Sequence, residues 1–217
     1  MRKCLKFTVL FSLLFFYACK SDNKERIQVV AQTKKELKDT AIVDCNYTFE
    51  EAVCGTNAPE EIIKELQIID VQYFSTDGKL HKGQIVTNKA IGGELKEIFA
   101  FVLKTKFPIA HAIPVVKYNW DDNLSMLDNN SYSFCYRNAS FSKHASGMAM
   151  DINPYFNPVR WKKGYENRPD KPEGAIWDTT INGTFYCSHP VVQEFIRFGF
   201  MWGHNFKMKY DDHHFEK

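Results

Sequence analysis

An excess of charge of one sign, a long apolar run inside the chain and closely spaced cysteines are all missing from this sequence. The 217 residues contain 28 Lys and Arg against 26 Asp and Glu, a net charge of +2. A protein that binds nucleic acid usually gathers its basic residues into a stripe or face, whereas this chain mixes both signs along its length. We therefore expect no nucleic-acid partner. The hydrophobic content of 44% is ordinary for a folded protein.

The longest apolar run lies at the N-terminus, over residues 7–17, after a positively charged start. A run of about eleven residues is too short to span a membrane as a mature helix, but it suits a signal peptide. Cys19 follows a small residue, as in a bacterial lipobox, although Phe16 stands where Leu is usual. We predict a lipoprotein signal peptide over residues 1–18 and a lipid anchor on Cys19, hence a lipid-anchored protein of the cell envelope. An ordinary signal peptide is the alternative.

Polar residues without strong periodicity follow the predicted signal peptide as far as residue 44. Such a composition cannot bury a core and is typical of a tether. We therefore assign residues 19–57 to the lipidated cysteine and tether, and residues 58–217 to one folded domain.

Four cysteines remain in the exported chain, and none has the C-x-x-C spacing typical of a zinc site. Two disulfides are possible in an exported protein. We favour Cys45 with Cys54, which closes a short loop, and therefore Cys135 with Cys187, although the sequence leaves the other pairings open.

Hydrophobic patterning predicts a single α+β domain without internal repeats. In the segment that opens at Gly92, apolar residues recur at the i, i+3, i+4 and i+7 spacing of an amphipathic helix. The predicted helices cover residues 58–66, 92–107 and 188–199. The predicted strands cover residues 69–74, 84–88, 109–116 and 147–152, with a last strand at the C-terminus.

The segment from Ser142 to Asn153 contains the first candidate site. From Gly147 onward it alternates, so Gly147, Ala149 and Asp151 share one face of a strand. Two small residues leave space beside the carboxylate, and His144 stands just before the strand. Close sheet packing and a strand-end cap would explain the small residues and Asp151, but they leave His144 without a role.

The C-terminus supplies a second cluster, in which two acids and two histidines precede Phe215. If Phe215 faces the core, His214 and Glu216 face the other way. Two histidines and one carboxylate form a hydrolytic zinc set that leaves a position for water. A carboxylate outside that set can move the water's proton. Spacing alone leaves two alternatives open. His213 could be the ligand in place of His214, with Asp212 as the catalytic acid, or Glu216 could be the catalytic acid.

Together these segments resemble the zinc peptidases that cut cell-wall peptides. This family includes D-alanyl-D-alanine carboxypeptidases, vancomycin-resistance dipeptidases and phage L-alanyl-D-glutamate endopeptidases. The resemblance covers roughly residues 80 to 217. It rests on Ser142-x-His144-x-x-Gly147-x-Ala149-x-Asp151, on a distal Trp-Gly pair and on a terminal Asp-x-x-His-Phe.

The resemblance implies a zinc ion held by His144, Asp151 and His214, because the family places its histidine directly before Phe. Asp211 then becomes the general base and acid. The implied fold is a small α+β domain with a central antiparallel sheet flanked by helices and zinc in a surface groove.

The same resemblance implies that Arg137 steadies the carbonyl or carboxylate of the substrate, and that Ser142 binds the substrate or orients the loop of His144. The expected activity is hydrolysis of peptidoglycan stem peptides next to a D-amino acid, by a monomer. A catalytically inactive, zinc-stabilised lipoprotein that binds the cell wall is the alternative. One departure from the family is Trp202-Gly-His204-Asn-Phe206, which replaces Trp-Gly-Gly-Asp-Trp.

Overall fold

The computed structural model describes residues 41–139 and 142–217 of the chain. Residues Ile42–Lys217 form one compact unit. The predicted signal peptide and the predicted lipid anchor on Cys19 lie outside the described residues. Among the described helices, none has the length and apolar character that a membrane span requires.

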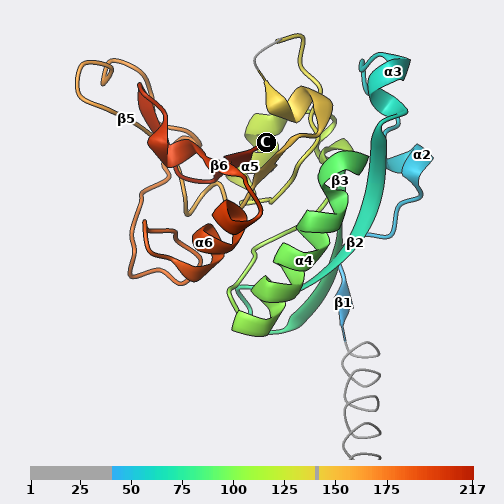
Figure 1. The fold of residues 1–217 in the computed structure, drawn as a ribbon, viewed down its shortest axis with the longest axis horizontal. Coiled ribbons are helices and arrows are strands. Elements are labelled where there is room, and N and C mark those ends of the chain that lie inside the picture. Colours follow the sequence, from blue (N-terminus) through green and yellow to red (C-terminus); the bar gives the residue numbers. More distant parts are fainter. Residues whose placement is uncertain (1–40, 140–141) are drawn as a thin grey trace, which may run out of the picture. The chain divides into compact units, whose positions relative to one another are not determined.

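The compact unit is α+β, as predicted (Figure 1). Its strands form three small sheets instead of the single central sheet that the family resemblance implies. The first sheet contains β1 (Ile42–Val43), β3 (Leu80–Asn88) and β2 (Leu66–Phe74), in that order. The second contains β4 (Ala149–Asp151), β8 (His214–Glu216) and β6 (Met201–Trp202), and the third pairs β5 (Val159–Trp161) with β7 (Lys209–Asp211).

Helices and single 3-10 turns connect these strands. The α-helices are α2 (Phe49–Ala52), α3 (Glu60–Ile63), α4 (Lys89–Thr105), α5 (Asp122–Leu127) and α6 (Pro190–Arg197). The 3-10 turns are η1 (Val115–Tyr118), η2 (Lys143–Ser146) and η3 (Gly203–Asn205).

The hairpin of β2 and β3 is longer than the predicted strands, and the helix α4 follows it directly. Asn88 begins α4 three residues earlier than predicted, because its side chain accepts a hydrogen bond from the backbone N–H of Ala90. Gly92 therefore lies inside the helix. A Cβ at Gly92 would stand 2.0 Å from Nε2 of Gln67, so this glycine lets α4 lie close to β2.

The main core forms between α4, the first sheet and the C-terminal strands. The predicted apolar face of α4 is buried, which confirms that pattern. Phe215 is fully buried as well, and its ring stacks on Phe195 of α6 with the centroids 4.0 Å apart. The helix α6 is shorter than the predicted range of residues 188–199, with His189 as its N-cap, and Ile196 on it is exposed.

Most of residues 109–116 are buried, as predicted, but they do not form a strand. Three of their backbone N–H groups donate instead to the side chains of Asn153, Tyr73 and Asn130. Pro114 cannot donate to a strand ladder. Side-chain partners thus replace the strand neighbours that a buried backbone would otherwise need.

The compact unit begins at Ile42, so residues 42–57 of the expected tether belong to it. The strand β1 pairs in parallel with β3, and Ala52 of α2 is fully buried. A capping box between Thr48 and Glu51 begins α2. Sequence periodicity misses this region because its elements are only two and four residues long.

The two expected disulfides do not form, since all four cysteines of the described region are free. Cys135 is buried and its sulfur lies 3.8 Å from the carbonyl oxygen of Trp120. Cys187 is exposed and its sulfur lies 3.8 Å from His204 instead. The expected pair Cys135–Cys187 therefore has one cysteine in the interior and the other at the surface.

Candidate metal centre

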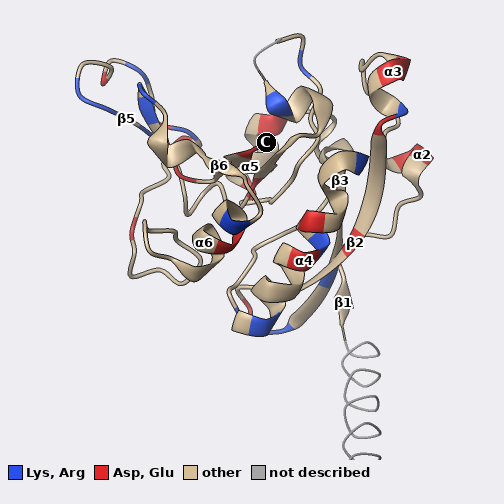
Figure 2. Cartoon of the chain, viewed as in Figure 1, with Lys and Arg blue, Asp and Glu red and all other residues tan. Residues whose placement is uncertain are grey.

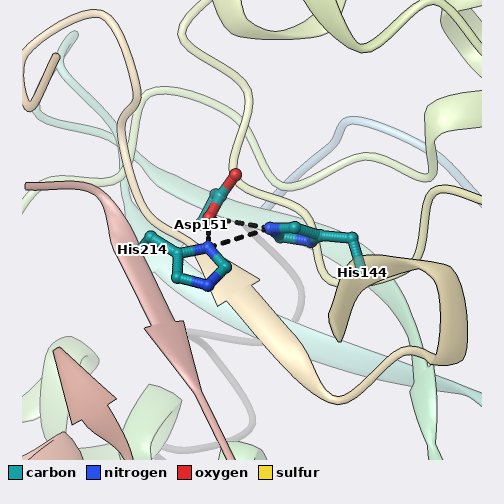
Figure 3. Close-up of side chains that lie close together, drawn as sticks. All are labelled: His144, Asp151 and His214. Atoms are coloured by element: carbon teal, nitrogen blue, oxygen red, sulfur yellow. Dashed lines mark hydrogen bonds and ion pairs between the residues drawn. The ribbon is translucent and has the colours of Figure 1, made fainter. Parts of the chain in front are cut away.

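Three side chains, two from neighbouring elements and one from near the end of the chain, converge on one point (Figure 3). Nε2 of His144 lies 3.1 Å from Oδ1 of Asp151 and 3.0 Å from Nδ1 of His214. The same Asp151 oxygen lies 2.9 Å from that His214 nitrogen. All three residues are buried, so their polar atoms depend on one another or on a bound ion.

The local fold explains this convergence. Asp151 ends β4 and His214 begins β8, and the two residues are direct partners in the antiparallel register. Side chains at such positions stand close together on one face of the sheet. His144 comes from η2, which ends at Gly147 with a φ of +68°. A Cβ at Gly147 would stand 2.8 Å from the backbone nitrogen of Asn88, so the turn needs glycine for space as well as for conformation.

The outer nitrogens of the two imidazoles settle which inner nitrogens carry lone pairs. Nδ1 of His144 lies 2.7 Å from the carbonyl oxygen of Ser133 and must donate to it. Nε2 of His214 lies 3.0 Å from Oε2 of Glu216 and donates to that carboxylate. In their neutral forms, both rings therefore direct a lone pair at the other and at Asp151. Only a positive charge between them makes this arrangement favourable.

The electrostatics of the cluster point the same way. Burial lowers the pKa of His214, but hydrogen bonds to Asp151 and Glu216 outweigh it and raise the pKa to about 10. Burial raises the pKa of Asp151, yet the histidines around it hold that pKa well below its usual range. The cluster therefore favours an ionised carboxylate beside a positive charge, which a divalent cation would supply.

The donor set fits zinc. Two imidazole nitrogens and one carboxylate oxygen are among the three-ligand sets of catalytic zinc sites, which leave a further position open. The candidate ligand atoms all lie within 4.8 Å of one another. His144, Asp151 and His214 are thus the residues that would hold the ion.

A cavity of about 600 Å³ opens beside the three candidate ligands. Arg137, Ser142 and Asp211, which the family resemblance marks for substrate binding and catalysis, also line it. The structure therefore brings all six residues to one cavity.

Asp211 is a buried carboxylate with two different oxygens. Oδ2 pairs with the ammonium group of Lys209 at 2.6 Å. Oδ1 lies 3.1 Å from Nε2 of His213, and it accepts no hydrogen bond from any group in the described part of the chain. This oxygen thus retains the capacity to accept a proton.

One family model matches the chain, over residues 136–217, and its description is D-alanyl-D-alanine carboxypeptidase. This segment is thus similar to that family. The matched range contains all three candidate ligands as well as Asp211 and Arg137, and it confirms the family resemblance of the sequence. No curated protein and no solved structure matches the chain.

Within the matched segment, the structure separates the two histidines that the sequence left as alternatives. His213 lies in the turn before β8 and is not part of that strand. Its Nδ1 donates to the carbonyl oxygen of Asn157, at 2.7 Å. Its Nε2 lies 3.6 Å from Oδ2 of Asp151, so His213 stands behind that carboxylate and outside the ligand cluster.

The two other candidates for the catalytic acid, Asp212 and Glu216, each have partners of their own. Asp212 is buried and turns to Arg160 and His204, away from the candidate ligands. Glu216 accepts a hydrogen bond from His214, which suits it to orient that ring. Asp211 therefore remains the cavity carboxylate with an oxygen, Oδ1, that has no hydrogen-bond partner among the described residues.

Arg137 forms part of the cavity wall, where its guanidinium pairs with Asp122 at 2.9 Å. Sequence reasoning missed this partner, and it also missed Lys209, the partner of Asp211. Lys209 stands two residues before Asp211 in β7, on the same face of the strand, so strand alternation would have identified it. No sequence signal identifies Asp122, because α5 approaches Arg137 through the tertiary fold.

Proposed function

We propose that the chain is a zinc-dependent peptidase that hydrolyses peptidoglycan stem peptides next to a D-amino acid. The observation that carries this proposal is the meeting of three ligand atoms, from His144, Asp151 and His214, in a cavity that also contains Asp211 and Arg137. The family match over residues 136–217 supports a carboxypeptidase-like hydrolase.

Each residue has a role in this proposal. Zinc, when bound, supplies a Lewis acid that brings the pKa of water to about 7. Asp211 uses its free Oδ1 to take a proton from the attacking water and passes it to the leaving amine. Arg137 presents a planar guanidinium to the substrate's carbonyl or carboxylate, and Ser142 binds the peptide at the opening.

Charge and size at the cavity agree with a short anionic peptide. A volume of about 600 Å³ lies in the range of sites that enclose small ligands. Lys143, Arg168 and Lys171 also line the cavity. Figure 2 shows basic residues on β5 and on the loop that follows it. Carboxylates of a stem peptide would meet these cations.

A second candidate is a catalytically inactive, zinc-stabilised protein that binds cell-wall peptides. One observation favours it: both catalytic candidates already have partners, Lys209 for Asp211 and Asp122 for Arg137. Burial raises the pKa of Asp211, but His213, His214 and Lys209 together lower it, and a lower pKa makes a weaker base. The peptidase proposal therefore requires substrate to displace at least one of these pairs.

Zinc content and muropeptide digestion together decide between the two candidates. We expect about one zinc per chain and new peptide products by mass spectrometry. His144→Ala should lose both zinc and activity, whereas Asp211→Asn should keep zinc and lose turnover by at least about 100-fold. Asp178→Asn, at a half-buried loop position that does not line the cavity, is the matched control and should change neither. Zinc without digestion in the unaltered protein would favour the binding protein.

We also propose that the protein is a lipid-anchored monomer of the cell envelope, with Cys19 as the modified residue. The proposal rests on the sequence of residues 1–19. Metabolic labelling with a fatty acid should mark the full chain, and Cys19→Ser should abolish the label. A label that survives this substitution would contradict the proposal.

A further inference from the structure

A second group of chemically active side chains lies outside the cavity and comprises Cys187, His204 and Asp212. Nδ1 of His204 lies 2.6 Å from Oδ1 of Asp212, and Nε2 of His204 lies 3.8 Å from the sulfur of Cys187. In the sequence, His204 follows Cys187 by 17 residues and precedes Asp212 by 8. None of them is among the described residues that line the candidate metal cavity.

The carboxylate at the inner end of this group is firmly held. Asp212 is fully buried, and its Oδ2 accepts two hydrogen bonds from the guanidinium of Arg160, at 2.9 and 2.7 Å. Its other oxygen is thereby left to His204. Two charge-assisted hydrogen bonds from one guanidinium fix the orientation of a buried carboxylate.

The imidazole in the middle is held on several sides. Its ring stacks on Trp202, with centroids 4.4 Å apart and planes 17° from parallel. The ammonium group of Lys162 donates to the backbone carbonyl of His204 at 3.2 Å. This histidine replaces the second glycine of the family's Trp-Gly-Gly pattern, so the group is a departure from that pattern.

These contacts settle the tautomer of His204. Its Nδ1–H donates to Asp212, so Nε2 carries the lone pair and faces the thiol of Cys187. A nucleophile, a base in contact with it and a carboxylate that orients the base are the three parts of a nucleophilic triad. Cys187 is exposed, so a reagent in solution can reach its sulfur.

We propose that Cys187 is a reactive thiol that exchanges with small disulfides, with His204 as its base and Asp212 as the positioning residue. In the step, Nε2 of His204 takes the thiol proton, and the Cys187 sulfur attacks one sulfur of the disulfide. The disulfide's own S–S bond breaks as a new one forms to Cys187. The released thiolate then receives the proton from His204, so no oxidant or reductant is consumed.

Cys54 provides an internal control, because it is also exposed and free and has no such partners among the described residues. The unaltered full-length protein is treated with a limiting amount of the aromatic disulfide 5,5′-dithiobis(2-nitrobenzoate) at pH 7, and each cysteine is followed by peptide mass spectrometry. We expect Cys187 to react at least about 10-fold faster than Cys54. Equal rates would overturn the proposal, whatever the variants do.

His204→Gln tests the base, because an amide can occupy the position without accepting a proton. The Cys187 rate should fall to that of Cys54, while the Cys54 rate stays unchanged and reports an intact fold. In this variant the Cys187 rate should also depend more steeply on pH than it does in the unaltered protein. His204→Gly, with added imidazole, should regain part of the rate. An unchanged Cys187 rate in His204→Gln would contradict the assignment of the base.

Discussion

Oε2 of Glu216 lies 3.0 Å from Nε2 of His214, on the side of the imidazole that faces away from Asp151. Glu216 and His214 are two residues apart in β8, so they share one face of that strand. The carboxylate fixes the proton of His214 on Nε2 and leaves Nδ1 free for a metal. Carboxylate–histidine pairs of this kind orient metal ligands and increase their basicity.

Glu216→Ala should therefore weaken zinc binding by about 10-fold to 100-fold, because His214 would lose its orienting partner. Glu216→Gln keeps an acceptor oxygen without the charge and should lose less. Competition with a chromogenic chelator measures both affinities, and Glu166→Ala, on an exposed loop, serves as the control. Equal affinities for all four proteins would show that Glu216 does not support the site.

Substitution of the two adjacent histidines tests the register of the metal site. His214→Ala removes one of three ligands and should reduce zinc affinity by at least about 100-fold. His213→Ala removes no ligand, only contacts with Asn157, Asp151 and Asp211, so its loss of affinity should be about 10-fold or less. Zinc content after dialysis distinguishes the two. A larger loss for His213→Ala would mean that His213 is the ligand.

Much of this site could be predicted because its ligands lie where local rules are strong. The alternation from Gly147 to Asp151 places the carboxylate on a face with small residues, and β4 forms there. The buried Phe215 likewise turns His214 toward Asp151. The choice of His214 over His213 needed the family pattern, because periodicity does not reveal that His213 lies in a turn.

The errors share a different physical cause. Residues 109–116 are apolar enough for a buried strand, but their backbone N–H groups donate to the side chains of Asn153, Tyr73 and Asn130. Such side-chain partners come from distant positions and leave no periodic signal. The disulfide prediction was wrong for a similar reason, because the spacing of four cysteines does not determine which sulfurs meet in space.

Gly147→Ala should both destabilise the fold and weaken metal binding. The left-handed conformation costs a Cβ about 1 kcal/mol, and the clash with Asn88 and Leu66 should add roughly 1–3 kcal/mol. Because Gly147 ends the turn that carries His144, the strain reaches that ligand. Gly164→Ala is the matched control, since its φ is also positive but its Cβ would meet nothing within 4 Å.

Denaturant unfolding of these two glycine variants, with and without zinc, measures the difference. Gly164→Ala should lose only the part of the unfolding free energy that comes from the left-handed conformation, and it should keep its zinc affinity. Similar losses in both variants would mean that the turn at Gly147 relaxes without disturbing His144.

The stability of the fold should depend on pH through His189, which begins α6 among the rings of Phe107, Phe185 and Tyr186. Burial lowers the pKa of His189 from 6.5 to about 4. The unfolded chain therefore takes up this proton at a higher pH than the folded chain does. The contribution to stability is complete above pH 6.5, decreases as the pH falls toward 4, and is lost below that value.

His189→Asn isolates this effect, because asparagine caps a helix as well as histidine does and does not titrate. Nδ1 of His189 now accepts from the backbone N–H of Val191, and protonation would abolish that bond. Between pH 6.5 and 4, the unaltered protein should lose about 1–2 kcal/mol more unfolding free energy than the variant, an amount reduced for partial exposure. Urea unfolding at both pH values measures the difference, and parallel pH curves for the two proteins would show that His189 is not the group responsible.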